Sequence, residues 1–245
     1  MAITFGNSSS GDTHNNNGDF LLHSISSTSN DVTAVSYNGV AMTQIGSAVY
    51  VSANNRYISL WGLVAPAQGS HNFTHTGGAD LDDTSLSVSG VSPTNPYTAI
   101  TNTNGSSTAP SITLTTLMTG SYILGTLFLV NSPYSVNTGT TERGVAGSYH
   151  NFYSSTNSVD ATSGTISITM TTHQWVFKAF SLNPVISFTQ LDTTSTTDIF
   201  FSWSVVVILA TIQDIVAISD SLLTTFKKWF NQIKNSSIWT NQNKQ

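Results

Sequence analysis

The sequence predicts an all-β protein, an antiparallel two-sheet β-sandwich followed by a C-terminal α-helix. From residue 2 to about 184, short runs of alternating apolar and polar residues are separated by Gly, Asn, Pro and Ser. These runs follow one another too closely for helical crossovers, so neighbouring strands are expected to pair antiparallel. The chain of 245 residues therefore divides into a β module (1–184), a linker or extra strand (185–198), a helix (199–235) and a polar tail (236–245).

The expected strands begin with a short one at 3–5. Ten further runs cover residues 19–28, 31–37, 40–45, 56–66, 70–78, 84–92, 110–117, 121–130, 164–172 and 173–182. The runs 56–66 and 121–130 lack clean alternation, which predicts central strands covered on both faces. The run 164–172 places Ile166, Ile168 and Met170 on one face and hydroxyl residues on the other, as in a half-solvated strand.

The stretch "SYNGVAMTQIG" (36–46) predicts a β-hairpin. Asn38 and Gly39 tolerate the positive φ angles of a type I′ turn, whose twist matches that of the flanking strands. The residues expected to pack across the turn are Val35 and Tyr37 with Val40, Met42 and Ile45. This hairpin is interpreted as a corner of the scaffold.

Two long connections, 91–111 and 131–164, are expected to be loops, and loops of this length are usually functional. The second one is rich in amphipathic rings that could stack on sugars or fill an interface. The candidate ligand-binding residues are Tyr134, Arg143, Tyr149, His150, Phe152 and Tyr153. The alternative is that these rings bury the loop against the sandwich.

One acidic turn is a candidate metal site. Asp80, Asp82 and Asp83 follow a pair of glycines, an oxygen-rich arrangement that could hold Ca²⁺, the one cofactor the sequence suggests. The alternative is an ordinary acidic turn. The six histidines are expected to be ordinary surface residues, because His71 and His75 would lie roughly 13 Å apart along a strand. The chain has no cysteine, which excludes thiolate metal sites and disulfides.

Catalysis and nucleic-acid binding are not expected. Glu142 is the only glutamate, and neither a nucleophile elbow nor a phosphate-binding loop is present. The formal charge is -5, and no basic stripe occurs before Lys227. The sequence therefore predicts no basic surface that could neutralise the phosphates of a nucleic acid. The sequence thus predicts a protein that is not an enzyme.

The C-terminal segment 199–235 shows helical periodicity. Its apolar stripe includes Ile212, Ile215, Val216, Leu222, Leu223, Phe226, Trp229 and Phe230. The uncharged part, 199–213, is shorter than the ~20 residues that span a bilayer. Three interpretations remain open: self-assembly or docking on other subunits, a membrane anchor, and packing on the chain's own sandwich.

Charged residues make up only 8% of the chain, and its first residues lack the basic and apolar regions of a secretory signal peptide. The segments "DVTAVSYNGVAMTQIGSAV", "RYISLWGLVAPAQGSHNFT", "GTTERGVAGSY" and "QWVFKAFSLNP" together resemble a β-sandwich module of phage virion and metagenomic surface proteins. That module is related to jelly-roll, concanavalin A-like and laminin-G sandwiches.

The resemblance, which covers residues 2–184, implies a virion or extracellular surface protein. Its expected partners are other virion or appendage subunits, further copies of itself, and cell-surface glycans. The alternatives are a membrane-anchored lectin-like protein and a secreted carbohydrate-active enzyme.

Overall fold

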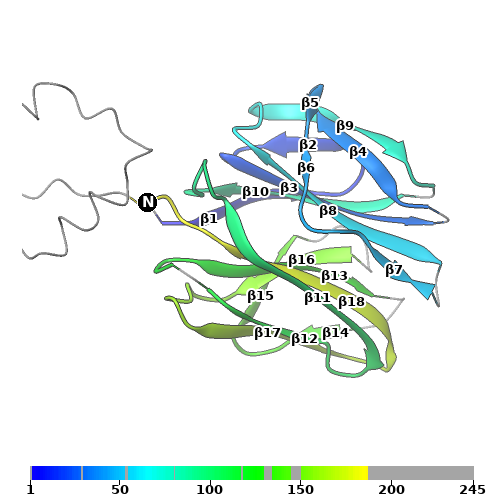
Figure 1. The fold of residues 1–245 in the computed structure, drawn as a ribbon, viewed down its shortest axis with the longest axis vertical. Helices are drawn as coiled ribbons and strands as arrows, with labels where there is room; N and C mark the ends of the chain where they lie inside the picture. Colours follow the sequence, from blue (N-terminus) through cyan, green and yellow to red (C-terminus); the bar gives the residue numbers. More distant parts are fainter. Residues whose placement is uncertain are drawn as a thin grey trace, which may run out of the picture. The chain divides into compact units, whose positions relative to one another are not determined.

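The computed structural model describes residues 2–28, 30–52, 55–79, 81–116, 118–129, 134–144 and 150–186. The regular elements in these ranges are β-strands, and the strands pair antiparallel. They form four sheets that stack as four layers (Figure 1). The predicted all-β antiparallel class is therefore confirmed, whereas the predicted number of two sheets is too small.

The first half of the module contributes an inner and an outer sheet. The inner sheet has the order β1 (Thr4–Ser9), β10 (Asp82–Ser89), β3 (Phe20–Thr28), β8 (Arg56–Val64) and β6 (Thr43–Gln44), and β7 (Val49–Val51) also pairs with β8. The outer sheet has the order β2 (Thr13–Asn16), β9 (Gly69–Gly77), β4 (Val32–Tyr37) and β5 (Val40–Ala41). The two sheets enclose the first-half core.

The second half repeats this arrangement. Its inner sheet has the order β11 (Tyr97–Ser107), β18 (His173–Leu182), β13 (Tyr122–Leu129), β16 (His150–Ser155) and β15 (Thr140–Gly144). Its outer sheet has the order β12 (Ser111–Thr115), β17 (Ser163–Met170) and β14 (Tyr134–Val136). Hence β1-β10-β3-β8 corresponds to β11-β18-β13-β16, and β2-β9-β4 corresponds to β12-β17-β14.

The pairing registers extend this repeat to single residues. Leu22 on β3 pairs with Leu86 on β10, and Leu124 on β13 pairs with Phe180 on β18. All four side chains belong to the same hydrophobic cluster. Aligning the two pairs gives each residue of these ladders an equivalent in the other half, so the module contains two copies of one strand arrangement.

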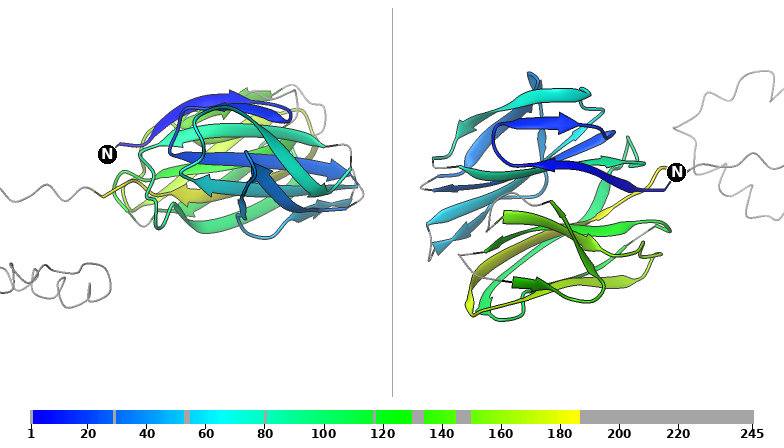
Figure 2. Two further views of the ribbon diagram at one scale, coloured as in Figure 1. Left: turned by 90° about the horizontal axis from the view of Figure 1, so that it is seen from above. Right: turned by 180° about the vertical axis from the view of Figure 1, so that it is seen from behind.

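The four sheets lie one on another (Figure 2), and three large clusters of buried apolar side chains pack between them. The first-half core consists of Leu21, Ile25, Val32, Val35, Tyr37, Met42, Trp61 and Phe73. The second-half core consists of Ile112, Leu114, Ile123, Leu127, Leu129, Tyr153, Ile166, Ile168, Met170, Trp175, Phe177 and Ala179. The interface core between the inner sheets consists of Ile3, Phe20, Leu22, Ile45, Leu60, Leu86, Val88, Val91, Leu124, Phe152, Phe180 and Leu182.

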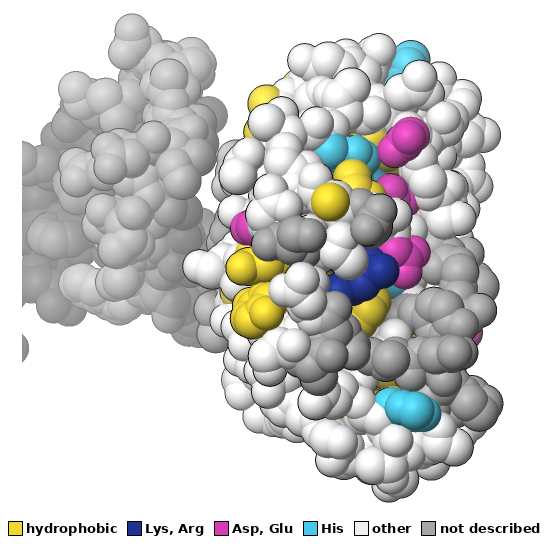
Figure 3. Space-filling view, turned by 90° about the vertical axis from the view of Figure 1, so that its right-hand side faces the viewer, with side chains coloured by type: hydrophobic (Ala, Val, Ile, Leu, Met, Phe, Trp, Pro, Cys, Tyr) yellow, Lys and Arg dark blue, Asp and Glu magenta, His cyan; other side chains and the backbone are white. Residues whose placement is uncertain are grey.

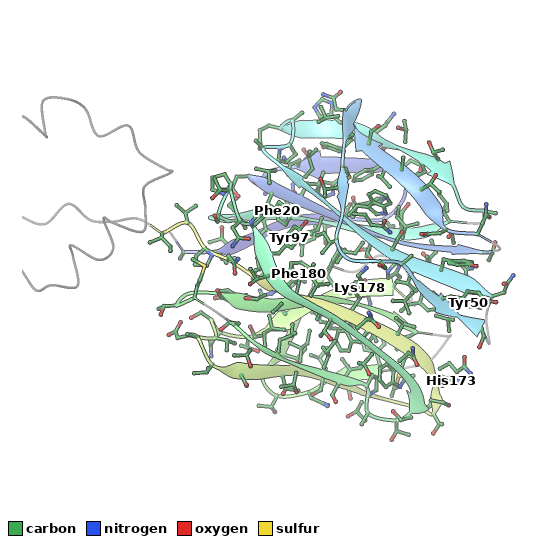
Figure 4. The ribbon with its side chains drawn as sticks, in the orientation of Figure 1. Phe20, Tyr50, Tyr97, His173, Lys178 and Phe180 are labelled. Atoms are coloured by element: carbon green, nitrogen blue, oxygen red, sulfur yellow. The ribbon has the colours of Figure 1, made fainter. Side chains whose placement is uncertain are left out.

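Side-chain alternation explains why the inner strands are buried on both faces. Successive residues of a strand point to opposite faces, so Leu21 enters the first-half core and Leu22 the interface core. The same holds along β8 and β13, whose central residues are buried, which confirms the prediction for these two runs. Phe20, Tyr97 and Phe180 lie between the inner sheets (Figure 4), with centroids 6.3 Å apart for Phe20–Tyr97 and 5.8 Å for Tyr97–Phe180.

Two local predictions are confirmed. Asn38 and Gly39 have φ angles of 50° and 77°, and Tyr37 pairs with Val40 across the turn. Val40 itself is 53% exposed, so it does not pack across the hairpin as expected. On β17, Ile166, Ile168 and Met170 are buried and alternate with more accessible residues.

Both predicted long loops contain β-strands. The segment 91–111 contains β11, which pairs along its length with β18. The segment 131–164 contains β14, β15 and β16. Asn, Ser, Thr and Gly dominate these segments and conceal their β structure, because intrinsic β-propensity is weaker than the pairing and burial supplied by a neighbouring strand. In the described parts of both segments, these residues form strands where a long exposed recognition loop was expected.

Contacts group the module into one compact unit, Met1–Phe188. Its last described residues return to the first half, where Val91 and Pro184 form an antiparallel bridge and the Val185 N–H donates to the Gly90 carbonyl at 2.9 Å. The rest of the predicted linker and the whole predicted helix lie outside the described residues.

Candidate functional site

The rings predicted to bind a ligand mostly serve the two cores. His150, Phe152 and Tyr153 lie on β16 and have no exposed surface. Phe152 belongs to the interface core and Tyr153 to the second-half core. These side chains therefore offer no free face for a sugar. They are buried in the sandwich, as the alternative interpretation expected. Tyr149 lies outside the described residues.

Tyr134 takes part in a hydrogen-bond network with Glu142, Asn151 and Tyr153. Its hydroxyl donates to Glu142 Oε1, and Asn151 Nδ2 donates to Tyr134 at 2.6 Å and to Glu142 Oε1 at 2.9 Å. Burial raises the pKa of the Tyr134 hydroxyl. Since β14 belongs to the outer sheet and β15 and β16 to the inner one, the network joins the two sheets of the second half.

Arg143 connects the two halves of the module. Its guanidinium carbon lies 4.1 Å from the centroid of the Phe5 ring on β1, a cation–π contact. Its Nε donates to Ser154 Oγ at 2.7 Å, and burial lowers its pKa. Arg143 therefore stabilises the contact between the halves at this edge.

The predicted calcium turn is not formed by the two acidic residues that the structure describes there. Asp82 and Asp83 are the first residues of β10, and successive strand residues point to opposite faces. Asp83 Oδ1 accepts the Gly11 N–H at 2.6 Å, whereas Asp82 interacts electrostatically with Arg56. The two carboxylates therefore do not share one ion. Asp80 lies outside the described residues.

Three of the six histidines contradict the expectation of surface residues. His14, His23 and His150 have no exposed surface. Burial lowers the pKa of His14 and of His150 to about 4 and lowers that of His23 well below its usual value. Strand alternation in the run 19–28 could have revealed His23, because it shares a face with Leu21 and Ile25, which are both buried.

A polar strip crosses the otherwise apolar interface between the inner sheets. The Ser24 hydroxyl donates to Thr126 Oγ1 at 2.8 Å, and His150 Nε2 lies 2.7 Å from Ser24 Oγ. Lys178, only 1% exposed, donates from Nζ to the Ser47 carbonyl at 2.7 Å. Burial lowers the pKa of Lys178 to about 8, while Asp31 acts to raise it. Sequence patterns did not point to these residues as a group.

A surface groove lies where β7 of the first half meets β11 and β18 of the second. Its volume is about 400 Å³, and Tyr50 and His173 lie at this end of the module (Figure 4). We call it the β7–β11–β18 groove. Its lining residues are Tyr50, Val51, Ser52, Asn104, Gly105, Ser106, Gln174, Trp175 and Val176.

The groove combines aromatic surface with amide and hydroxyl groups. The Tyr50 side chain is 48% exposed, and its ring lies 4.8 Å from that of Tyr57. The Trp175 ring lies against the glycine at 105, where an added Cβ would be 3.0 Å from Trp175 Cζ2. The amides are those of Asn104 and Gln174. Such surfaces bind polar, uncharged ligands that also have apolar faces.

No protein-family model, curated protein or solved structure matches this chain. The geometry of the module is therefore the basis for any functional proposal.

The eight residues of the predicted assembly or membrane stripe, Ile212 to Phe230, lie outside the described residues. In the part of the chain that the structure describes, no helix is long and apolar enough to span a bilayer. The three interpretations of the C-terminal segment remain predictions from sequence.

Proposed function

We propose that this chain is a non-enzymatic structural or appendage protein of a virus particle that presents the β7–β11–β18 groove to glycans. Two features support the structural part of the proposal. When strands are counted along the chain within each half, the last strand of the half lies between the first and the third in the inner sheet, and a later strand follows the third. In the outer sheet, the second strand pairs with the penultimate one. This is jelly-roll topology, which is used by viral capsid and lectin domains.

The second feature is the uncharged character of the chain, in which charged residues make up 8% of the total. Hydroxyl and amide side chains replace them as the polar groups of the surface, as on the accessible positions of β11 and β17. This composition agrees with the module that the sequence resembles, which occurs on virions and cell surfaces.

The groove is the observation that carries the glycan part of the proposal. Sugars have apolar C–H faces that stack on aromatic rings, and hydroxyls that bind amides, and the groove supplies both through Tyr50, Asn104 and Gln174. Among the described residues, those that line it include no Asp or Glu. Glycoside hydrolysis generally requires a pair of carboxyl groups about 5–10 Å apart, so the lining favours binding without cleavage.

A glycan array probed with the full chain and with Tyr50→Ala tests this proposal. We expect the wild-type protein to bind a subset of glycans and Tyr50→Ala to lose at least tenfold in affinity for them. Val40→Ala, which removes another exposed side chain on the β4–β5 hairpin, is the control and should bind as the wild type does. Absence of binding to every glycan, or unchanged binding by Tyr50→Ala, would contradict the glycan proposal.

The assembly part of the proposal depends on the C-terminal segment 199–235, whose apolar stripe suits docking on other subunits or self-association. Light scattering coupled to size exclusion should show an oligomer for the full chain and a monomer for residues 1–186. Two monomers in plain buffer would contradict self-assembly. A full chain that requires detergent would instead support the second candidate, a membrane-anchored lectin-like protein, whose anchor would have to extend beyond the uncharged stretch 199–213.

A further inference from the structure

We propose that His23, His75 and Asp83 form a binding site for a divalent transition-metal ion in the first half of the module. One potential ligand atom of each residue lies within 4.8 Å of those of the other two. The Nε2 atoms of His23 and His75 are 2.9 Å apart. This contact has the length of a hydrogen bond between the two rings. Two nitrogens bound tetrahedrally to one ion at about 2.1 Å are separated by about 3.4 Å, so the rings would have to move apart by about 0.5 Å to become neighbouring ligands.

The three residues come from different strands. His23 and Asp83 lie on β3 and β10 of the inner sheet, and His75 lies on β9 of the outer sheet. Ligands around one ion at about 2.1 Å are at most about 4 Å apart, so the set has to contract slightly on binding. An ion at this position would connect the two sheets that enclose the first-half core.

The surroundings of the three residues resemble the outer shell of a metal site. Ligating histidines usually direct their other ring nitrogen at a carboxylate, and ligating carboxylates accept further hydrogen bonds. His75 Nδ1 lies 3.9 Å from the carboxylate of Asp12, and Asp83 Oδ1 accepts the Gly11 N–H. His23 is fully buried and stacks on Phe73 at a centroid distance of 3.8 Å, which fixes its ring plane.

The cluster contains two acidic side chains whose charges a cation would balance. Asp83 is 5% exposed, and the Asp12 carboxylate lies 3.9 Å from His75 Nδ1. Metal ions bind the neutral form of imidazole and the ionised form of a carboxylate. A divalent ion would therefore place positive charge beside both carboxylates.

The second half provides an internal comparison, because its equivalent positions are apolar. In the aligned ladders, Gly125 is the equivalent of His23 and Phe177 the equivalent of Asp83. One strand arrangement thus carries two potential ligands in one half and buried core residues in the other. Packing of the arrangement does not by itself require His23 or Asp83.

The donor set favours a borderline ion such as Zn²⁺. Two imidazoles and a carboxylate suit Zn²⁺, Fe²⁺ or Ni²⁺, whereas Ca²⁺ and Mg²⁺ prefer sets made entirely of oxygen atoms. On one face of the molecule, exposed histidine and acidic side chains adjoin one another (Figure 3). Asp12 is 78% exposed at this face, so an ion has access from solvent.

Titration calorimetry with Zn²⁺ on the full chain, prepared with EDTA and without a histidine tag, tests the site. We expect one Zn²⁺ per chain and a rise in Tm of about 5 °C or more at a hundredfold excess over Kd. His75→Gln should lower the affinity at least tenfold. His71→Gln, the same substitution on the same strand but outside the cluster, should leave the affinity unchanged.

Asp12→Asn keeps the test decisive if His75→Gln fails to fold, because it alters an exposed side chain. Loss of this negative charge, 3.9 Å from His75 Nδ1, should weaken Zn²⁺ binding about tenfold. The proposal is overturned if the wild-type chain takes up no Zn²⁺, or if binding by both His75→Gln and Asp12→Asn equals that of the wild type. Ca²⁺ should produce no comparable rise in Tm, and a larger rise with Ca²⁺ than with Zn²⁺ would also overturn it.

Discussion

Ser24 and Thr126 occupy equivalent positions in the two halves of the module and hydrogen-bond to each other at 2.8 Å. Residues that contact their own equivalents lie close to the axis of a two-fold arrangement. Ser24 and Thr126 are both fully buried, so the centre of the interface between the inner sheets is polar. His150 extends this polar centre, since its Nε2 lies 2.7 Å from Ser24 Oγ.

The first prediction concerns this polar centre. Ser24→Ala removes the partner of both Thr126 Oγ1 and His150 Nε2, whereas Thr126→Val removes one hydroxyl and leaves the Ser24–His150 contact in place. Because buried polar groups without partners are costly, we expect Ser24→Ala to lower the free energy of unfolding by about 1–3 kcal/mol and Thr126→Val by about 1 kcal/mol. Urea denaturation at pH 7 measures both, and the reverse order would contradict the described contacts.

The second prediction concerns the interface core. Leu124 is fully buried between the inner sheets, so Leu124→Ala should cost about 2–5 kcal/mol. Since both halves contribute side chains to the interface core, we expect both halves to lose stability equally. Hydrogen exchange followed by mass spectrometry should show faster exchange in β3 as well as in β13.

A matched control for Leu124→Ala is Ile100→Ala, because the Ile100 side chain is 41% exposed. It should change the stability by less than about 0.5 kcal/mol. Faster exchange confined to the second half of the Leu124→Ala protein would show that the halves unfold independently.

The fold class and several strands could be predicted because their signals are local. The Asn38–Gly39 turn depends on two neighbouring residues, and the unbroken apolar runs on β8 and β13 reflect burial on both faces. The strand β11 was missed because its sequence, "YTAITNTNGSS", has the composition of a loop. Its structure comes from its long pairing with β18, which no local pattern reveals.

The internal repeat could not be recognised from sequence because equivalent residues differ in type. Trp61 lies in the first-half core, and its equivalent Tyr153 lies in the second-half core. His23 corresponds to Gly125, where an added Cβ would lie 2.9 Å from the Ala179 Cβ. Similar strand orders therefore carry dissimilar side chains. The candidate metal ligands were missed for a related reason, since they are distant in sequence and meet only when β9 covers β3 and β10.

The third prediction is a loss of stability in acid. The pKa of His150 falls from 6.5 to about 4 in the folded state, so between these values the unfolded chain binds more protons and stability rises with pH. From pH 7 to pH 4.5 this residue alone should remove about 2 kcal/mol. His14 and His23 act in the same direction, whereas Asp83, whose pKa rises to about 6, acts in the opposite one.

Urea denaturation of the wild type and His150→Gln at pH 7 and pH 4.5 isolates the contribution of this side chain. The difference in unfolding free energy between the two pH values should be smaller by about 2 kcal/mol in the variant. An equal difference in both proteins would show that His150 is not responsible for acid sensitivity.

The fourth prediction concerns Lys178 and alkaline pH. Burial lowers the pKa of its ammonium group from 10.5 to about 8, so between these values the unfolded chain binds more protons than the folded one. Stability should therefore rise between pH 7 and pH 9.5, by about 2 kcal/mol from this residue. Lys178→Met has no such group, so the rise should be absent in that variant.

At pH 7 we expect Lys178→Met to be as stable as the wild type or more stable, because replacing a buried charge by an apolar side chain of similar length removes its desolvation cost. The Ser47 carbonyl loses its Nζ donor, which opposes this gain by about 1 kcal/mol. Denaturation curves at pH 7, 8.5 and 9.5 for both proteins provide the comparison. A Lys178→Met protein that is several kcal/mol less stable at pH 7, or that keeps the full alkaline rise, would show that the buried ammonium group is compensated by its surroundings.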